Sequence, residues 1–258
     1  MTEARNWSLS EEVRDYWSGR AATFDNQHGH RITDGPEMAA WEALIARATG
    51  QARLDGWQVL DLACGTGEIS RLALSMGASV TGVDFSEPML ERARTKHARA
   101  DWRGVLADVQ ALPGLPDHGF DLALARHLVW TLTDPAAAFA AWMRVLRPGG
   151  ALVIVDGNWA TESLSGQVMQ ALAERMAPKD AGRGEDLARH RRILADLPYR
   201  DGLTYARLSG DLRAAGFARI ARLPIWRVYR IGMRRIPLSD WLRLNAASRF
   251  ALVAHKAM

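Results

Sequence analysis

The sequence predicts an α/β protein built around a doubly wound, mostly parallel sheet. From Trp57 onward, short apolar runs alternate with segments of helical periodicity, the pattern that places a parallel sheet between two helical layers. A chain of 258 residues, 48% of them hydrophobic and 24% charged, is long enough to bury a sizeable core. The predicted core strands are Gln58–Leu62, Ser79–Val83, Trp102–Ala107, Phe120–Ala125 and Ala151–Asp156.

Capping signals mark the helices between these strands. Ser86, Glu87 and Pro88 supply a cap, an acidic first turn and a proline within that turn, and Asp134-Pro135 offers the same start to a later helix. Arg147–Gly150 is expected to end that helix and turn the chain into the next strand. A helix over Tyr205–Ala215 ends at Gly216, and the runs Ala218–Leu223 and Arg249–His255 would complete the sheet.

Two regions lie outside this predicted core. Residues 1–55 have helical periodicity, with a capping box at Ser8–Glu11, and are expected to form an N-terminal helical lid. Residues 157–204 contain two helix-like stretches joined by a loop at Pro178–Glu185, which predicts a helical cap over the carboxyl end of the sheet. The chain thus divides into a lid (1–55), a core (56–156), a cap insertion (157–204) and the C-terminal part of the sheet (205–258).

The composition excludes several classes of protein. A single cysteine, Cys64, excludes a disulfide framework and sites built from several thiolates, and it favours a reducing cytoplasm. Residues 1–13 show neither a signal peptide nor a transit peptide, and no apolar run reaches the roughly 18 residues of a membrane span. The net charge of +4 is carried almost wholly by arginine, and many of the arginines follow residue 182. A solvated surface is favoured over a face for anionic partners, and nucleic acid is the least favoured partner.

A glycine-rich turn follows the first strand. Asp61–Glu68 reads DLACGTGE, in which small residues let a ligand approach the backbone and the N–H groups of the helix start offer donors to an anion. Ser70 stands where a dinucleotide fingerprint has its third glycine. The alternative is that the glycines serve only the turn itself.

Two acidic residues follow the next two strands. Asp84 ends the second strand and suits ribose hydroxyls, although it is also a possible helix cap. Asp108 and Val109 follow the third strand, where a carboxylate can accept from an exocyclic adenine amine and a backbone N–H can reach the ring. The alternative for Asp108 is a simple turn residue before Pro113.

In this order and spacing, the motifs resemble those of the class I S-adenosylmethionine-dependent methyltransferases. The resemblance spans about residues 58–156 and rests on Asp61-x-x-Cys64-Gly65-x-Gly67, Asp84–Ser86 and Leu146–Gly150. The last of these is typical of the small-molecule branch that looks like the ubiquinone- and menaquinone-biosynthesis methyltransferases. The resemblance implies a Rossmann-like, seven-stranded sheet and S-adenosylmethionine as cofactor, with S-adenosylhomocysteine as product.

The resemblance also assigns residues to the cofactor. Asp61 opens the glycine motif, and Ala63, Gly65 and Gly67 would line the methionine moiety. Asp84 would bind the ribose, Phe85 and Met89 would pack against the adenine, and Asp108 with Val109 would bind its edge. Tyr16 of the N-terminal helix, which also carries Trp17, Arg20 and Phe24, would donate to the cofactor carboxylate.

The fourth strand delivers Arg126, His127 and Trp130 to the carboxyl edge, where ligands of open α/β sheets bind. His127 is the candidate catalytic base, because its ordinary pKa lies near neutrality; the alternative is a structural hydrogen bond. Arg126 would bind the cofactor carboxylate or a substrate acid, or pair with an Asp. The candidate substrate contacts are Trp130, Trp159 and Tyr199, with Met169 and Met176 as further cap residues.

The function predicted from these residues is methyl transfer to an oxygen, nitrogen or sulfur atom of a small organic molecule. Transfer from a sulfonium needs an in-line, water-excluded arrangement and no metal, so His28 and His30 are interpreted as a polar loop. Three alternatives stay open: a non-catalytic cofactor-binding regulator, an RNA methyltransferase, and a nicotinamide oxidoreductase. The sequence leaves the choice between monomer and homodimer open.

Overall fold

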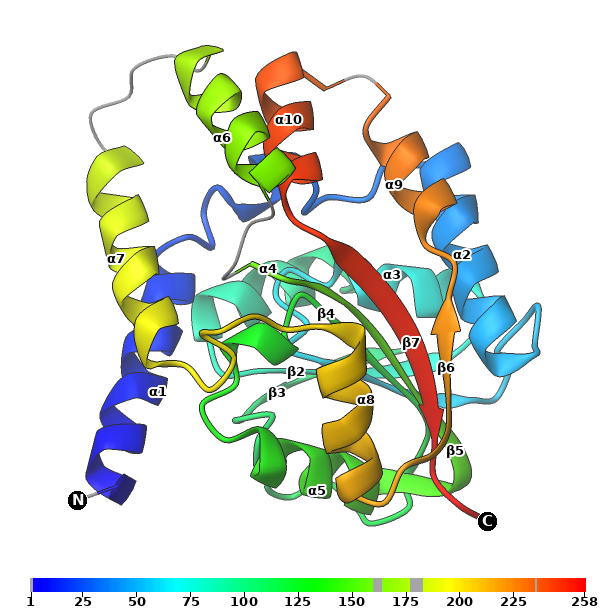
Figure 1. The fold of residues 1–258 in the computed structure, drawn as a ribbon. Helices are drawn as coiled ribbons and strands as arrows, with labels where there is room; N and C mark the ends of the chain where they lie inside the picture. The colour runs from blue at the N-terminus through cyan, green and yellow to red at the C-terminus, as the bar shows by residue number, and fades with distance from the viewer. Residues whose placement is uncertain (1, 160–163, 177–182, 235) are drawn as a thin grey trace.

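The computed structural model describes residues 2–159, 164–176, 183–234 and 236–258 and shows a single sheet of seven strands (Figure 1). The strand order is β3-β2-β1-β4-β5-β7-β6. Strands β1 to β5 run parallel, whereas β7 runs antiparallel to both β5 and β6. The bounds are β1 Gln58–Leu62, β2 Ser79–Asp84, β3 Trp102–Leu106, β4 Phe120–Arg126, β5 Leu146–Gly157, β6 Ala218–Leu223 and β7 Arg249–His255. The predicted α/β class and Rossmann-like sheet are therefore confirmed.

One strand differs clearly from its prediction. The strand expected to begin at Ala151 begins at Leu146, so Arg147–Gly150 is part of extended β5 rather than a separate turn. Leu146 pairs with Phe120, and the register shifts between Phe120 and Leu122. That irregularity takes up the additional residues, and Gly149 adopts a positive φ of 76° within them.

Helices cover both faces of the sheet and bury alternate residues of each strand. In β4, Ala123 and Ala125 belong to a cluster with α5, α8, α1 and α7, whereas Leu122 and Leu124 belong to a cluster with α2, α3 and α9. This period of two is the burial pattern of a sheet covered on both sides. The helices are α1 Thr2–Ser18, α2 Pro36–Thr49, α3 Glu68–Ser75, α4 Glu87–Lys96, α5 Pro135–Val145, α6 Leu164–Met176, α7 Arg183–Asp196, α8 Tyr205–Ala214, α9 Trp226–Gly232 and α10 Leu238–Ala246, with short 3-10 turns at Phe24–Asn26 and Val129–Thr131.

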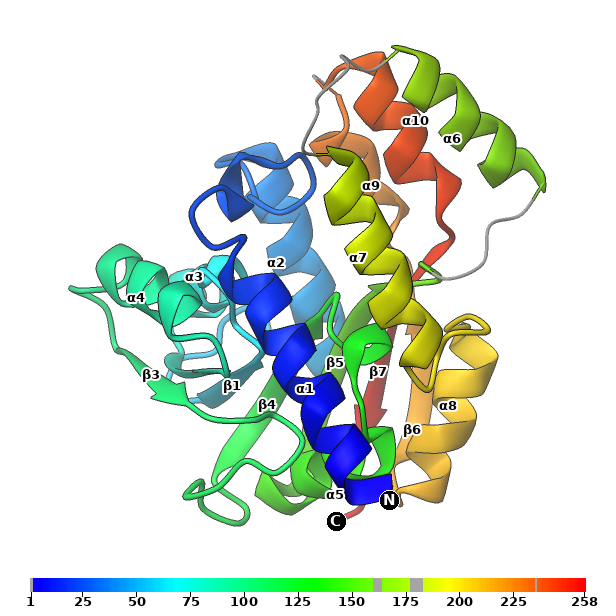
Figure 2. The same cartoon turned by 90° about the vertical axis from the view of Figure 1, so that its left-hand side faces the viewer.

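The N-terminal helix runs across the molecule next to α7 (Figure 2). It extends over Thr2–Ser18, so Ser8–Glu11 lies inside the helix and the predicted capping box is wrong. Helical periodicity located the helix correctly, but a Ser-x-x-Glu pattern also occurs within helices.

The helical cover over the carboxyl edge comes from two separate parts of the chain. Helices α6 and α7 lie in the predicted cap, and α10, which lies between β6 and β7, packs against α6 (Figure 1). Helix α7 begins at Arg183, within the loop predicted at Pro178–Glu185; residues 177–182 lie outside the described residues. Among the described residues, no helix is both long enough and apolar enough to cross a membrane.

Candidate active site

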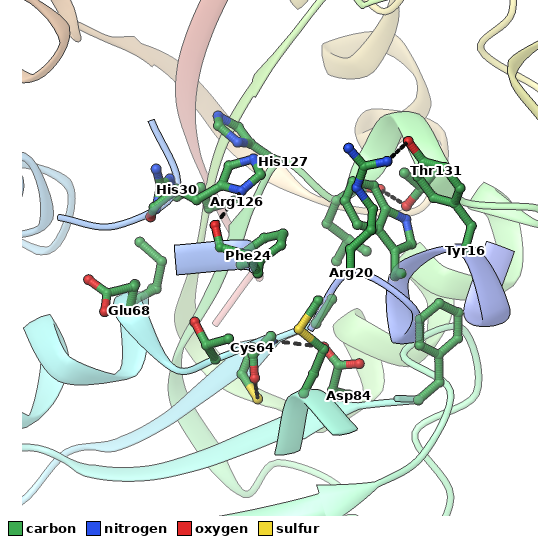
Figure 3. A pocket seen from close by; sticks show the side chains of 18 of the residues that line it. Tyr16, Arg20, Phe24, His30, Cys64, Glu68, Asp84, Arg126, His127 and Thr131 are labelled. Atoms are coloured by element: carbon green, nitrogen blue, oxygen red, sulfur yellow. Dashed lines mark hydrogen bonds between the residues drawn. The ribbon is translucent and has the colours of Figure 1, made fainter. Parts of the chain in front are cut away.

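A cavity of about 300 Å³ lies at the carboxyl edge of the parallel strands, and residues of α1 and α7 contribute to its lining (Figure 3). This is the edge at which open α/β sheets bind ligands. Strand tips and lid helices both contribute to its walls. The lining residues are Tyr16, Trp17, Arg20, Phe24, Gln27, His30, Asp61, Ala63, Cys64, Gly65, Thr66, Glu68, Ile69, Asp84, Phe85, Met89, Arg126, His127, Leu128, Trp130, Thr131, Trp159 and His190.

The glycine-rich turn presents its backbone to this cavity. Ala63 and Gly65 have positive φ angles of 52° and 53°, and both residues line the cavity. A Cβ on Gly65 would meet only the Phe24 side chain, at 3.9 Å, so space is open beside the backbone. Small residues here allow a ligand to approach the chain closely, as the motif predicts.

Gly67 is placed differently from its prediction, because it is not among the lining residues. Its φ is 84°, and a Cβ there would lie 2.5 Å from Nε2 of His97. The same His97 nitrogen lies 2.9 Å from the Gly67 carbonyl oxygen. The second glycine of the motif therefore allows helix α3 to start against His97, the C-cap residue of α4, rather than forming part of the cavity wall.

Asp84 ends β2 with a buried carboxylate at the cavity rim (Figure 3). Its Oδ2 accepts a hydrogen bond of 2.8 Å from the Gly65 amide, and its Oδ1 accepts one of 2.9 Å from the Ser86 amide. Burial raises the pKa of Asp84 to about 6, although these hydrogen bonds oppose the shift. Ser86, not Asp84, caps helix α4, because its Oγ accepts from the Met89 amide.

Asp61 lies beneath the glycine turn and also lines the cavity. Ser70 Oγ donates to Asp61 Oδ2 at 2.6 Å, and Trp102 Nε1 donates to Ser70 Oγ at 2.9 Å. Burial raises the pKa of Asp61 to about 7. The serine that replaces the third glycine of a dinucleotide fingerprint therefore has a role of its own, since it provides a hydroxyl donor to this carboxylate.

The residues predicted to hold an adenine lie next to the main cavity. Asp108, Val109 and Phe85 line a separate cavity of about 30 Å³, large enough for only about two water molecules. Ser10 and Val13 of α1 also line this small cavity. Phe85 lines both cavities, and Met89 lines only the main one. The Asp108 carboxylate accepts from the backbone amide and the side chain of Gln110.

His127 occupies the tip of β4 with a positive φ of 55°. Its Nε2 lies 3.3 Å from the hydroxyl of Tyr229, and its ring meets Trp159 edge-on at 5.2 Å. Burial lowers the pKa of His127 well below its usual range, and the positive charges of Arg126 and Arg249 add to this shift. The imidazole is therefore neutral at pH 7, the form that can accept a proton. Trp130, also a lining residue, donates from Nε1 to the His127 carbonyl at 3.1 Å.

Arg126 lines the cavity, and backbone carbonyls rather than an aspartate hold its side chain. The buried guanidinium donates to the backbone carbonyls of Gly29 and His30, and it lies 5.0 Å over the ring of Trp41. No ion pair with an aspartate forms among the described residues, and Nε has no hydrogen-bond partner there. Arg126 thus holds the loop after α1 against the strand tips. The position of a long side chain relative to a distant loop could not be read from sequence.

The lid places aromatic residues and histidines over the cavity. Tyr16 receives a 2.6 Å hydrogen bond from Arg20, and its hydroxyl lies 3.2 Å from Nδ1 of His190 in α7. Phe24 stacks on His30 with ring centroids 4.1 Å apart. Burial, with Arg126 as a further cause, lowers the pKa of His30 to about 4. The polar loop predicted at His28 and His30 therefore forms part of the cavity wall.

Sequence reasoning missed some residues and misplaced others. It missed His190, which contacts Tyr16, and Tyr229, which contacts His127; both lie on helices without any recognisable motif. Trp159 does line the cavity, but Tyr199 does not: it is buried in the core and donates to Asp211 Oδ2 at 2.8 Å. Met169 and Met176 are not lining residues either.

Comparisons with known proteins agree with this arrangement. Residues 60–154 match the family model described as "Methyltransferase domain". The chain is 38% identical over 164 residues to a malonyl-[acyl-carrier protein] O-methyltransferase of Serratia marcescens, covering 64% of this chain and 59% of that protein. It is 38% identical over 161 residues to a demethylmenaquinone methyltransferase of Chlamydia trachomatis, covering 60% and 65%. The chain thus spans less than two thirds of the length of these relatives.

A solved structure extends the comparison to nearly the whole chain. Phosphoethanolamine N-methyltransferase 2 of Haemonchus contortus, in complex with S-adenosyl-L-methionine, superimposes with a TM-score of 0.63 over 95% of this chain and 60% of that one. The sequence identity is 17%, so this similarity concerns the fold alone.

Proposed function

We propose that this chain is an S-adenosylmethionine-dependent methyltransferase, because residues 60–154 match a methyltransferase domain model and the similar curated proteins are named as methyltransferases. The methyl group would pass to an oxygen, nitrogen or sulfur atom of a small organic molecule. One observation carries the proposal: a single cavity has the Gly65 and Asp84 turn on one wall and His127 with aromatic side chains on the other. A cofactor and an acceptor held on these two walls would meet between them.

The residues present fit this cofactor at its methionine and ribose end. The backbone beside Gly65 is open, and Asp84 offers a buried carboxylate to ribose hydroxyls. Tyr16 and Arg20 are placed to bind an amino-acid carboxylate. When bound, the sulfonium supplies an already activated methyl group.

The adenine end needs more room than the structure provides. Asp108 and Val109 lie beside a cavity that Val13 and Ser10 of α1 restrict to about 30 Å³. A purine bound there would displace this part of α1. We infer that the N-terminal helix moves when the cofactor enters, which agrees with the lid predicted for residues 1–55.

The opposite wall suits an organic acceptor with apolar surface. Trp17, Trp130 and Trp159 exclude water, and an in-line displacement needs a dry, aligned site. His127 is neutral and can accept the proton that a hydroxyl, thiol or ammonium acceptor loses. Tyr229, at hydrogen-bond distance from Nε2, would orient the ring.

Two further proposals concern the setting of the reaction. We propose a small-molecule acceptor rather than RNA, because aromatic side chains line the cavity and no separate basic module is evident in the printed sequence. We also propose a cytoplasmic location, which fits the single buried cysteine.

Calorimetry followed by a turnover assay tests the proposed function. Titration with S-adenosylhomocysteine should show one site per chain, and NAD should show none. Methyl-labelled S-adenosylmethionine should then transfer its label to members of a panel of phenols, thiols, amines and carboxylic acids. Binding without turnover on any acceptor would favour a regulatory binder, and an absence of binding would overturn the proposal. Undiminished kcat of His127→Ala across pH 6–9 would exclude His127 as the base.

A further inference from the structure

Arg249, the first residue of β7, lies in an unusual position behind the wall of the cavity. Since β7 runs antiparallel to β5, its start lies at the same edge of the sheet as the tips of the parallel strands, and Arg249 pairs with Gly157. Its guanidinium lies 4.5 Å from the ring centroid of Tyr229 and 5.3 Å from that of Trp159. These rings contact His127, one by a hydrogen bond and the other edge-on.

Two nitrogens of the Arg249 guanidinium are buried and have no hydrogen-bond partner among the described residues. Nε and Nη2 are both buried, and neither donates a hydrogen bond to any described residue. These nitrogens share one edge of the planar guanidinium, the fork that binds a carboxylate through two parallel hydrogen bonds. The two aromatic rings offset part of the cost of burying the charge, but they leave both N–H donors unsatisfied.

Within the part of the chain that the structure describes, no carboxylate pairs with this charge. The carboxylate of Asp156 is used elsewhere: Oδ2 accepts from the Val129 amide, and Oδ1 accepts from the Gly157 amide and from Trp159 Nε1. Arg126 adds a second buried positive charge to the same region. Buried charges in proteins are normally paired, so an open fork beside a ligand cavity indicates that a ligand completes it.

We propose that Arg249 forms a carboxylate-binding subsite that anchors an anionic group of the methyl acceptor next to His127. Trp159 both lines the cavity and lies next to the guanidinium, so the acceptor would reach Arg249 by displacing this side chain. Tyr229 and Trp159 would contact an apolar or aromatic body attached to the carboxylate. That the bound anion belongs to a methyl acceptor rests on the proposed function, whereas the existence of an anion-binding subsite at Arg249 does not.

A matched pair of probes tests the subsite directly. Benzoate and benzamide have nearly the same shape and differ in charge, and each is titrated by calorimetry with and without saturating S-adenosylhomocysteine. Benzoate should bind at least tenfold more tightly than benzamide to the wild type, and the preference should fall below twofold in Arg249→Met. Arg227→Met removes one positive charge from the exposed face of α9 and should retain the preference.

The folded state of the variant is checked in the same series. Removing an unpaired buried charge should leave the thermal midpoint of Arg249→Met equal to that of the wild type or higher, and benzoate should raise the midpoint of the wild type only. Arg249→Lys keeps the charge and loses the fork, so it should show an intermediate preference. Equal binding of the two probes to the wild type, or a preference that survives in Arg249→Met, would overturn the subsite.

The cofactor's own carboxylate is the competing source of an anion. S-Adenosylhomocysteine carries that group and 5′-methylthioadenosine lacks it, so their affinities separate the two cases. Arg249→Met should change both affinities by less than twofold. A selective loss of S-adenosylhomocysteine binding would assign Arg249 to the cofactor instead and overturn the acceptor subsite. If the wild type binds neither nucleoside, the proposed function fails, while the benzoate titration without nucleoside still tests the subsite.

Discussion

The two walls of the cavity are built in different ways. On the strand wall, the turn after β1 places Gly65 beside Asp84 at the end of β2, and the Gly65 amide donates a hydrogen bond to the Asp84 carboxylate. On the helix wall, His127 meets Tyr229 of α9, and Tyr16 of α1 meets His190 of α7. The first wall depends on local turn geometry, whereas the second depends on packing between distant segments. We therefore expect the first to determine the cofactor and the second to determine the acceptor.

Asp84→Ala should have the largest effect, and it tests the strand wall. Loss of the ribose contacts should weaken S-adenosylhomocysteine binding by about 2–4 kcal/mol, on the order of 30- to 1,000-fold. Calorimetry measures this change, and urea unfolding verifies that the variant is folded. Asp201→Ala, an exposed acid, is the matched control. An affinity within threefold of the wild type would refute the ribose assignment.

Gly67→Ala separates the structural glycine of the motif from the one that faces the cavity. The positive φ and the contact with His97 should together lower the free energy of unfolding by roughly 2–4 kcal/mol. Gly50→Ala has a similar φ of 73° with nothing within 4 Å, and should cost only about 1–2 kcal/mol. Urea titration compares the two. Equal losses would show that His97 contributes nothing, and Gly67→Ala/His97→Ala should regain part of the difference.

His127→Gln tests the electrostatics of the helix wall. The folded pKa of His127 is depressed, so below about pH 6.5 the unfolded chain takes up a proton that the folded chain does not. The wild type therefore loses stability as the pH falls, and glutamine removes that loss. When the pH falls from 7.5 to 5.5, the unfolding free energy of His127→Gln should rise relative to that of the wild type by about 1 kcal/mol. A pH-independent difference would contradict a buried, neutral His127.

Tyr229→Phe should give the smallest effect. It removes a single hydroxyl beside His127 Nε2 and should cost about 0.5 kcal/mol of unfolding free energy, the lower end of the usual range for one hydrogen bond. Tyr205→Phe is the control, because that hydroxyl makes no hydrogen bond among the described residues, and it should be neutral. If Tyr229→Phe also leaves stability unchanged, the hydrogen bond to His127 contributes nothing in solution.

Sequence reasoning predicted the sheet well because strand patterns are local. The bounds of β1, β6 and β7 match their predictions, and five residues that the resemblance assigns to the cofactor line one cavity: Ala63, Gly65, Asp84, Phe85 and Met89. Sequence reasoning did not reach contacts between distant segments. Gly67 packs against His97, Tyr199 belongs to the core, and Arg126 holds the loop at Gly29 and His30, yet none of these contacts has a sequence signature.

By itself, the sequence determined the doubly wound sheet, the glycine turn and the acidic strand end, since periodicity, capping and turn chemistry act over a few residues. Only the tertiary structure decided which helices cover the cavity, that α1 restricts the adenine side, and that Arg249 lies buried without a partner. Those features arise from contacts between segments far apart in the chain. Their energies depend on burial and on neighbouring charges, which a linear pattern does not contain.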